Sequence, residues 1–188
     1  MTVSEAPLIE TARLRLRPLA ETDIADWARL LYADPDVTRY LPGPDVTPEE
    51  RAARLYKHFS EHWPRHGYGE WAVTDRSTGV FLGQAGLNHI PDIAETELDY
   101  ALAKHAWGRG LATEAARAAV RYAFEAAGLT RLIGFVIPEH VASRRVLERL
   151  GFVFEESTHF WGVDLVRYGL TPEQFAAAAT ALPALESS

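Results

Sequence analysis

The feature that most constrains the fold is a strand, a glycine turn and a helix in direct succession. Residues 95–102 alternate like a strand, Gly108 and Gly110 form a turn nearly without side chains, and residues 112–127 carry an apolar stripe at helical spacing. The first four N–H groups of a helix lack partners, and the helix dipole is positive there. Glycines at that point let a phosphate approach the backbone. The turn therefore predicts either an anion site or simply a tight strand-to-helix connection.

Two known nucleotide loops do not fit this turn. A P-loop ends in Gly-Lys-Ser/Thr, whereas the nearby Lys104 precedes the turn. The dinucleotide fingerprint needs a third glycine or an alanine where Thr113 stands, and an acidic residue after the next strand. If the glycine turn binds an anion, it does so as neither a P-loop nor a dinucleotide-binding loop.

The remaining chain predicts one α+β domain over residues 8–182, with flexible ends at 1–7 and 183–188. Residues 132–137 form a continuous apolar run, typical of a strand buried on both faces. Strands are expected at about 13–17, 69–74, 80–90, 95–102, 132–137, 152–156 and 162–170, and helices at about 22–32, 48–62, 112–127 and 142–150, followed by a tail helix from Thr171.

Composition limits the possible partners and chemistry. The chain has 188 residues, a formal net charge of −7 and no cysteine. An acidic chain is a poor general binder of nucleic acid or anionic membranes, so we expect neither partner. Without cysteine there is no thiol nucleophile and no zinc–thiolate site. No signal peptide or spanning helix is recognisable, so we expect a cytoplasmic protein, a monomer or a homodimer.

Three ordered motifs resemble the GNAT superfamily of N-acetyltransferases, and more closely its branch of Rim-type ribosomal-protein N-terminal acetyltransferases. They are the opening IETARLRLRPLAETDIADWARLLYADPDVTRYL, the loop WGRGLATEA from Trp107, and PEHVASRRVLERLGF from Pro138. The resemblance covers residues 8–170. It implies a GNAT-like, mostly antiparallel sheet of about seven strands, flanked by helices, with a splayed parallel pair formed by residues 95–102 and 132–137. It also implies acetyl-CoA as cofactor and an amine as acceptor.

The resemblance places the coenzyme along the glycine turn and the splayed strands. The backbone of Gly108, Arg109, Gly110, Leu111, Ala112 and Thr113 would hold the pyrophosphate, with Arg109 as a charge partner. Ala101 and Leu102 would face the pantetheine arm, and an N–H near Ala101 to Ala103 would meet the oxyanion. His140 stands where the family usually has asparagine, and Arg144 or Arg145 would reach the 3′-phosphate.

Acetyl transfer to an amine requires removal of a proton from the ammonium. Glu97 and Asp99 lie two apart on one strand, so both side chains share a face. The resemblance favours Glu97 as the base, whereas Asp99 replaces a glycine of the branch and would add a second acid or block part of the acceptor site. Ser143 would serve the leaving thiolate, or simply cap the next helix. A solvated strand face is the alternative for both carboxylates.

The acceptor side is expected to be aromatic. In relatives the corresponding region walls the acceptor, so Trp63, Tyr68 and Trp71, with Phe59 and His66, are expected around it, and Asn88 and His89 across from them. Histidines 58, 62 and 66 have helical spacing, but we expect packing rather than a metal site. The acceptor is either a protein N-terminus or a small amine. The alternative function is a non-catalytic coenzyme A-binding sensor or interaction module of the same fold.

Overall fold

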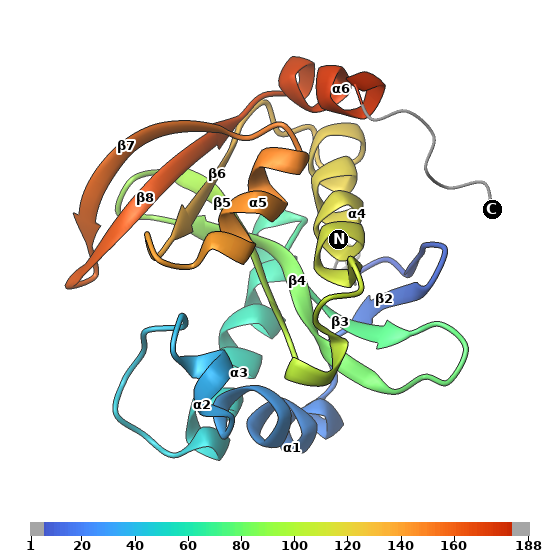
Figure 1. The fold of residues 1–188 in the computed structure, drawn as a ribbon. Coiled ribbons are helices and arrows are strands. Elements are labelled where there is room, and N and C mark those ends of the chain that lie inside the picture. Colours follow the sequence, from blue (N-terminus) through green and yellow to red (C-terminus); the bar gives the residue numbers. More distant parts are fainter. Residues whose placement is uncertain (1–5, 182–188) are drawn as a thin grey trace.

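The computed structural model describes residues 6–181, which form one eight-stranded sheet with helices on both faces (Figure 1). The strands are β1 Ile9–Glu10, β2 Leu14–Pro18, β3 Glu70–Asp75, β4 Phe81–Ile90, β5 Glu95–Leu102, β6 Leu132–Val136, β7 Val153–Phe160 and β8 Val163–Leu170. The α-helices are α1 Ile24–Trp27, α2 Pro35–Thr38, α3 Pro48–His66, α4 Leu111–Glu125, α5 Val141–Arg149 and α6 Pro172–Ala181. The mixed α+β class is confirmed.

The sheet confirms the predicted topology. Its order is β1-β2-β3-β4-β5-β6-β8-β7, and neighbours are antiparallel except for β5 and β6. These two parallel strands pair at a single position, Glu97 with Ile133, and then diverge. The divergence leaves an open edge of β5 next to the turn that leads into α4. The sheet has one strand more than the seven expected from the sequence. This additional strand is β1, which pairs with β2 through Ile9 and Leu16.

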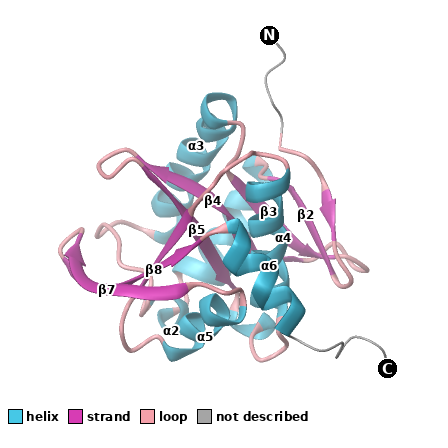
Figure 2. Ribbon diagram, turned by 90° about the horizontal axis from the view of Figure 1, so that it is seen from above, coloured by secondary structure: helices cyan, strands magenta, loops and turns pink. Residues whose placement is uncertain are grey.

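Helices α3 and α5 lie on opposite sides of the strands (Figure 2), and an apolar core lies on each face of the sheet. One is built on α4 and α5 and includes Leu98 and Leu102 of β5, whereas the other lies under α1 and α3 and includes Ala101. Successive residues of a strand point to opposite faces. Glu97, Asp99 and Ala101 therefore face α3, while Leu98 and Leu102 face α4.

An ion-pair network ties the start of β5 to the strands beyond the divergence. Glu95 pairs with Arg131, just before β6, at 3.3 Å and also with Arg167 of β8. Both arginines pair with Glu155 of β7, at 2.6 and 3.2 Å. Because parallel strands start at the same end, this network closes one end of the β5–β6 pair and leaves the other end open.

Glu114, in the first turn of α4, fixes the helix start against the sheet edge. Its carboxylate accepts hydrogen bonds from the Thr11 hydroxyl at 2.6 Å and from the backbone N–H and the guanidinium of Arg13 at 2.8 and 2.7 Å. These contacts span about a hundred residues of sequence. The glycine turn is thereby held in a constant place relative to β2.

Two helices differ from the sequence expectation. The segment expected as one helix from 22 to 32 contains a 3₁₀ turn, the short α1 and a π-helical turn, Ala28–Tyr32. The helix from Pro48, expected to end near His62, instead continues through Pro64 to His66. Pro64 lies on the exposed side, where water can satisfy the carbonyl that loses its partner, and Gly67 at φ 73° ends the helix.

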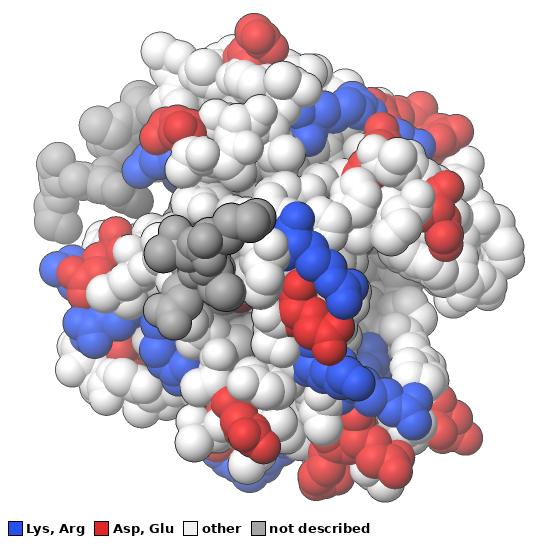
Figure 3. Space-filling view, turned by 180° about the vertical axis from the view of Figure 1, so that it is seen from behind, with Lys and Arg blue, Asp and Glu red and all other residues white. Residues whose placement is uncertain are grey.

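Most of the expected flexible ends, residues 1–5 and 183–188, lie outside the described residues. Ala6 is buried, and the carbonyl of Pro7 accepts a hydrogen bond from the Trp71 indole at 2.8 Å. Within residues 6–181, none of the helices has the length and apolarity to cross a bilayer. On the face shown in Figure 3, basic and acidic side chains lie interspersed.

Candidate active site

Two cavities meet beside β5. The larger, about 630 Å³, lies along the glycine turn and the starts of α4 and α5, and the smaller, about 370 Å³, lies between α3, β4, β5 and β6. Six of the described residues line both cavities: Tyr40, Leu41, Tyr100, Ala101, His140 and Ser143. A molecule lying in the larger cavity can therefore present one end to the smaller one.

The glycine turn opens backbone donors to the larger cavity. Gly108 and Gly110 have φ of 72° and 74°, a left-handed region that favours glycine. Helix α4 begins after Gly110 without a cap from any described side chain. The indole of Trp107 donates to the Leu102 carbonyl at 2.7 Å and so fixes the turn to the end of β5. The first N–H groups of α4 are thus held toward the cavity and remain unpaired by side chains.

Most predicted coenzyme residues lie on the larger cavity: Ala101, Leu102, Gly108, Gly110, Leu111, Ala112, Thr113, His140 and Ser143. Arg109 and Arg144 do not line it. Arg144 instead donates to the Tyr168 hydroxyl at 3.0 Å, and Arg145 and Arg149 line the cavity. Residues four apart share one helix face, so Arg145 and Arg149 point together while Arg144 points elsewhere. We therefore replace Arg144 by Arg145 and Arg149 as candidate phosphate ligands.

The structure narrows the choice of the backbone N–H, expected near Ala101 to Ala103, that could bind the oxyanion. The N–H of Ala103 donates to the Leu82 carbonyl at 2.8 Å, so it is not free. Backbone N–H groups of a strand alternate between its two neighbours. The N–H of Leu102 therefore faces the diverging side of β5, where pairing with β6 has already ended.

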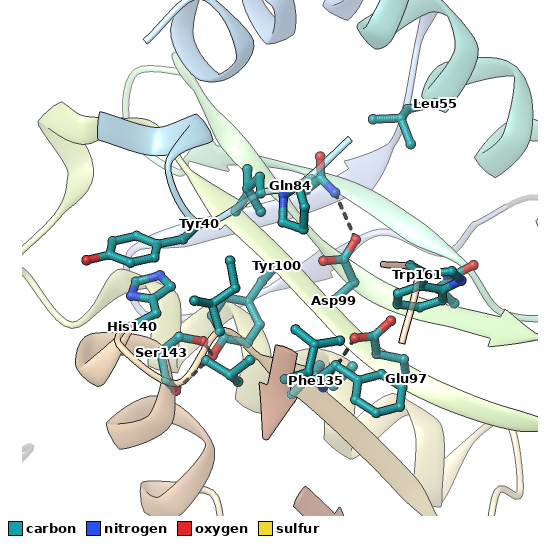
Figure 4. A pocket seen from close by; sticks show the side chains of 18 of the residues that line it. Tyr40, Leu55, Gln84, Glu97, Asp99, Tyr100, Phe135, His140, Ser143 and Trp161 are labelled. Atoms are coloured by element: carbon teal, nitrogen blue, oxygen red, sulfur yellow. Dashed lines mark hydrogen bonds between the residues drawn. The ribbon is translucent and has the colours of Figure 1, made fainter. Parts of the chain in front are cut away.

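Two carboxyl groups form the floor of the smaller cavity (Figure 4). Asp99 accepts a hydrogen bond from the Gln84 amide at 3.1 Å, and Gln84 in turn lies 3.5 Å from the Tyr32 hydroxyl. Glu97 accepts one from the Phe135 backbone N–H at 3.3 Å. The structure thus brings both predicted acids into one cavity, on the face of β5 that adjoins α3.

Burial sets the ionisation of this pair. Burial, followed by the charge of Asp99, raises the pKa of Glu97 to about 8. Burial also raises the pKa of Asp99, but the hydrogen bond from Gln84 and the charge of Arg51 act in the opposite direction. Two adjacent buried carboxyl groups cannot both ionise easily. A negative charge on the pair is therefore favoured on Asp99, which has the Gln84 donor and the nearby charge of Arg51, over Glu97.

A third carboxyl group, which the sequence did not reveal, lies behind the pair. Glu70 is fully buried, and its two carboxylate oxygens have no hydrogen-bond partner among the described residues. In the sheet register Glu70 faces Gly86, and Gly86 faces Asp99. A Cβ on Gly86 would lie 2.9 Å from the Glu70 carboxyl carbon, so that carboxyl group extends over Gly86. Burial, and then the charge of Asp99, raises the pKa of Glu70 well above its ordinary value.

A pair of hydroxyl groups lies where the two cavities join. Ser143 is the third residue of α5, whose N-cap residue is His140, so Ser143 does not cap the helix. Its hydroxyl lies 2.8 Å from the hydroxyl of Tyr100. Burial raises the pKa of Tyr100, so this group stays protonated, and it donates to the Ser143 carbonyl at 3.2 Å. Sequence reasoning missed Tyr100, although it directly follows Asp99.

His140 stacks on Tyr40, with ring centroids 4.1 Å apart and planes 12° apart. Burial lowers the pKa of His140, which keeps the imidazole neutral at neutral pH. Both rings line both cavities. They therefore cover the junction between them, next to Ser143.

The acceptor residues expected from the sequence are divided between the two faces. Asn88 lines the smaller cavity and its amide oxygen lies 3.1 Å from the His58 ring nitrogen, whereas Trp63, Tyr68, Trp71 and His89 do not line it. Trp63 and Trp71 pack edge to face, with centroids 4.8 Å apart, in the core under α4. Strand alternation explains this, since Glu70 and Ala72 take the cavity side of β3 and Trp71 the other. We therefore remove these four from the candidate acceptor residues.

Of the two further expected residues, Phe59 lines the smaller cavity and His66 does not. Other side chains around it include Tyr32, Arg51, His58, Gln84, Phe135 and Trp161. Of the three histidines at helical spacing, His62 has a structural role. His62 lies 2.8 Å from the Tyr68 carbonyl through one ring nitrogen and accepts from the His89 N–H through the other, at 2.9 Å. Among residues 6–181, no group of three or more His, Asp or Glu side chains is arranged to hold a metal ion.

Comparison with known proteins agrees with this geometry. The chain is 30% identical to the FsC-acetyl coenzyme A-N(2)-transacetylase of Aspergillus fumigatus, over 93% of this chain and 80% of that one. An acetyltransferase structure from Agrobacterium tumefaciens superposes with a TM-score of 0.79 at 31% identity, covering 88% and 95% of the two chains. Mycobacterium smegmatis RimJ in complex with CoA-disulfide has the same fold, with a TM-score of 0.72 at 24% identity over 88% and 89%.

The fold of a Rim-type protein is therefore shared, while the Rim-type branch stays a prediction. The family model described as an acetyltransferase (GNAT) domain matches residues 13–153. That segment contains the glycine turn, the acidic strand and α5. The chain therefore belongs to the GNAT acetyltransferases and is an acyltransferase.

Proposed function

We propose that this enzyme transfers the acetyl group of acetyl-CoA to a primary amine by direct attack in a ternary complex. The observation that carries the proposal is the junction of two cavities at Tyr100 and Ser143. One cavity has the backbone donors that a diphosphate requires, and the other has a buried acidic floor. A thioester and an amine bound in these two places would meet at the junction.

The larger cavity suits coenzyme A, the acetyl carrier that GNAT acetyltransferases use. The uncapped start of α4 would hold the pyrophosphate, with Arg145 and Arg149 available to a further phosphate. The open edge of β5 would pair with the amides of the pantetheine arm, because unpaired backbone groups are costly. The N–H of Leu102 is suitably placed to stabilise the thioester oxygen as it gains charge.

The acidic pair would prepare the acceptor. An alkyl ammonium has a pKa near 10 and must lose a proton before it can attack. We assign that proton to Asp99, the member of the pair whose charged form the Gln84 amide and the charge of Arg51 favour. Glu97, whose pKa burial raises to about 8, would keep a second negative charge out of the cavity. This reverses the order in which the sequence ranked the two acids.

The hydroxyl pair would serve the leaving group. Once the amine nitrogen had bonded to the carbonyl carbon, it would release its extra proton to water as the carbon–sulfur bond broke, and the sulfur would take up a proton from water. The Tyr100 hydroxyl, turned from the Ser143 carbonyl, would donate a hydrogen bond to that sulfur, and Ser143 would orient Tyr100 through their 2.8 Å contact. With no cysteine in the chain, no thiol acyl-enzyme is available, which supports direct transfer.

The acidic pair is tested by comparing Asp99→Asn and Glu97→Gln. We expect Asp99→Asn to lower kcat by about 100-fold or more near neutral pH, and Glu97→Gln to lower it by less. Coenzyme affinity, measured by calorimetry, should remain unchanged in both, because neither side chain lines the larger cavity. A larger loss in Glu97→Gln would return the role of base to Glu97. Coenzyme binding without thiol release on any amine or peptide would favour the sensor.

A further inference from the structure

The hairpin between β7 and β8 ends in an unusual turn. Phe160 and Val163 face each other in register, and the two residues between them, Trp161 and Gly162, have φ of 52° and 78°. Left-handed φ at both central residues is typical of a type I′ turn, in which Asn-Gly is the preferred sequence. A bulky residue with positive φ is rare because its Cβ crowds the backbone. The local backbone therefore disfavours tryptophan at position 161.

Packing does not explain the choice of tryptophan. Trp161 is 56% exposed as a residue, and it belongs to neither of the two cores of the described chain. Its ring belongs to a small aromatic cluster, with centroids 4.5 Å from Phe160 and 5.7 Å from Phe135. An exposed indole in a disfavoured conformation points to a binding function, because strained residues cluster at ligand sites.

The indole lies at the acceptor cavity. Trp161 and Phe135 line it, and Figure 4 shows both rings beside Glu97, on the side of the cavity away from Tyr40 and His140. The Phe135 N–H also holds Glu97. Aromatic rings therefore form one wall next to the carboxyl floor. At about 370 Å³ the cavity is near the lower end of the range for small-molecule sites.

We propose that Trp161 is an acceptor-recognition residue that selects a primary amine bearing an aromatic ring or a similarly flat apolar group. The inference rests on the proposed function, because it assumes that the amine end lies over Asp99. The flat group then stacks on Trp161 and Phe135, where it removes apolar surface from water. Such an acceptor fits the cavity better than a hydrophilic polyamine, whose remaining charges would face the aromatic wall.

The test uses Trp161→Asn, which converts the turn to Asn-Gly. Because that sequence suits a type I′ turn, we expect the melting temperature to stay constant or rise. The ratio of kcat/KM for 2-phenylethylamine to that for n-butylamine should exceed one in the unchanged enzyme and fall about tenfold in this variant, as expected for loss of an aromatic contact and its buried area. Trp161→Phe retains a ring and should keep most of the ratio.

Ala94→Asn is the matched control. Ala94 is also a non-glycine residue with positive φ, 53°, but it lies in the β4–β5 turn and lines neither cavity. This variant should leave the ratio unchanged. An equal loss for both amines in Trp161→Asn, or a preference of the unchanged enzyme for n-butylamine, would overturn the inference.

A second readout separates this inference from the proposed reaction. Calorimetry measures 2-phenylethylamine binding to the enzyme loaded with coenzyme A, with and without Trp161→Asn. Binding that weakens in the variant supports the recognition role even if no amine is acetylated, in which case the proposed reaction alone fails. Binding that is equal in both proteins, or absent from the unchanged enzyme, overturns the recognition role.

Discussion

The two cavities that meet at β5 are built in different ways. The larger one offers backbone groups of a glycine turn, of the uncapped start of α4 and of the open edge of β5, beside side chains such as Tyr40 and Arg145. The smaller one is formed by side chains such as Asp99 and Gln84, drawn from α3, β4, β5, β6 and the tip of the β7–β8 hairpin. The coenzyme half thus depends on local chain geometry, and the acceptor half on which side chains the fold brings together.

This difference predicts how each half tolerates change. Only proline removes a backbone N–H donor, so most substitutions disturb the coenzyme half by placing groups in its way. The acceptor half loses function when a single polar group is deleted, since each buried group depends on a few partners. The predictions below test that contrast from the largest expected effect to the smallest.

The largest effect is expected for Gly110→Asp. Asp tolerates the left-handed φ of Gly110 better than most residues, and a carboxylate suits a helix N-terminus, so the fold should persist. The same carboxylate repels a phosphate and competes for its N–H donors. We expect coenzyme affinity to fall about 1,000-fold, the loss of two or more charge-assisted hydrogen bonds, as measured by calorimetry.

Gly110→Asn separates charge from shape. Asn has the size and backbone preference of Asp without its charge, and at this position an added Cβ would meet no atom closer than 3.7 Å. Coenzyme affinity should therefore fall much less than in Gly110→Asp. Equal losses in the two variants would show that the turn does not bind an anion.

The next effect is expected for Tyr100→Phe, at the junction of the halves. The ring keeps its packing while the hydroxyl that faces Ser143 disappears, so kcat should fall by about 100-fold, the usual loss for one donor to a developing charge. Coenzyme affinity should stay the same. Ser143→Ala, which leaves the Tyr100 hydroxyl in place, should lower kcat less. The reverse order, read from single-turnover kinetics, would make Ser143 the donor.

A smaller effect, on stability, is expected for Glu70→Gln in the acceptor half. Burial raises the folded-state pKa of Glu70, so the folded protein binds this proton more tightly than the unfolded chain. Glu70 therefore costs stability as pH rises above the unfolded pKa, up to its raised folded pKa. Gln has no such penalty. Above pH 5, the melting temperature of the variant relative to the unchanged protein should increase by about 3 °C per pH unit.

Glu95→Gln provides the contrast for Glu70→Gln. Glu95 is paired with Arg131 and Arg167, so its removal should lower the melting temperature at neutral pH. A difference between Glu70→Gln and the unchanged protein that stays constant from pH 5 to pH 8 would show that Glu70 is not held protonated.

The geometry of the larger cavity was largely predictable from sequence because its main determinants are contiguous. Trp107 to Thr113 contains both glycines, the indole that fixes the turn and the first residues of α4. The strand periods also gave the order of the elements. The parallel pair and its divergence came from the resemblance to the family, since one residue of pairing leaves no periodic signal.

The acceptor half was less predictable because strand parity and helix rotation decide it. Trp71 and Glu70 are neighbours, yet one lies in the core under α4 and the other behind Asp99. The expected strand at 69–74 already implies that Glu70 and Trp71 lie on opposite faces of the sheet. The sequence does not show which of the two faces holds the site. Phe135 lies in the strand 132–137 that was expected to form the splayed pair, and Trp161 lies just before the expected strand 162–170, but neither side chain was given a role from the sequence.

The smallest effect is expected for two adjacent arginines of α5. Within one helix turn, they test which side chain contributes charge to the coenzyme half. Arg145 lines the coenzyme cavity, whereas Arg144 donates to Tyr168. An exposed arginine on a phosphate contributes little and is screened by salt. Arg145→Ala should weaken coenzyme A binding about threefold at low salt, less at high salt, and hardly at all with 3′-dephospho-coenzyme A. Arg144→Ala should leave all three affinities unchanged. Salt-independent losses from both variants would mean that α5 contributes structure rather than charge, and the coenzyme half would then rest on its backbone alone.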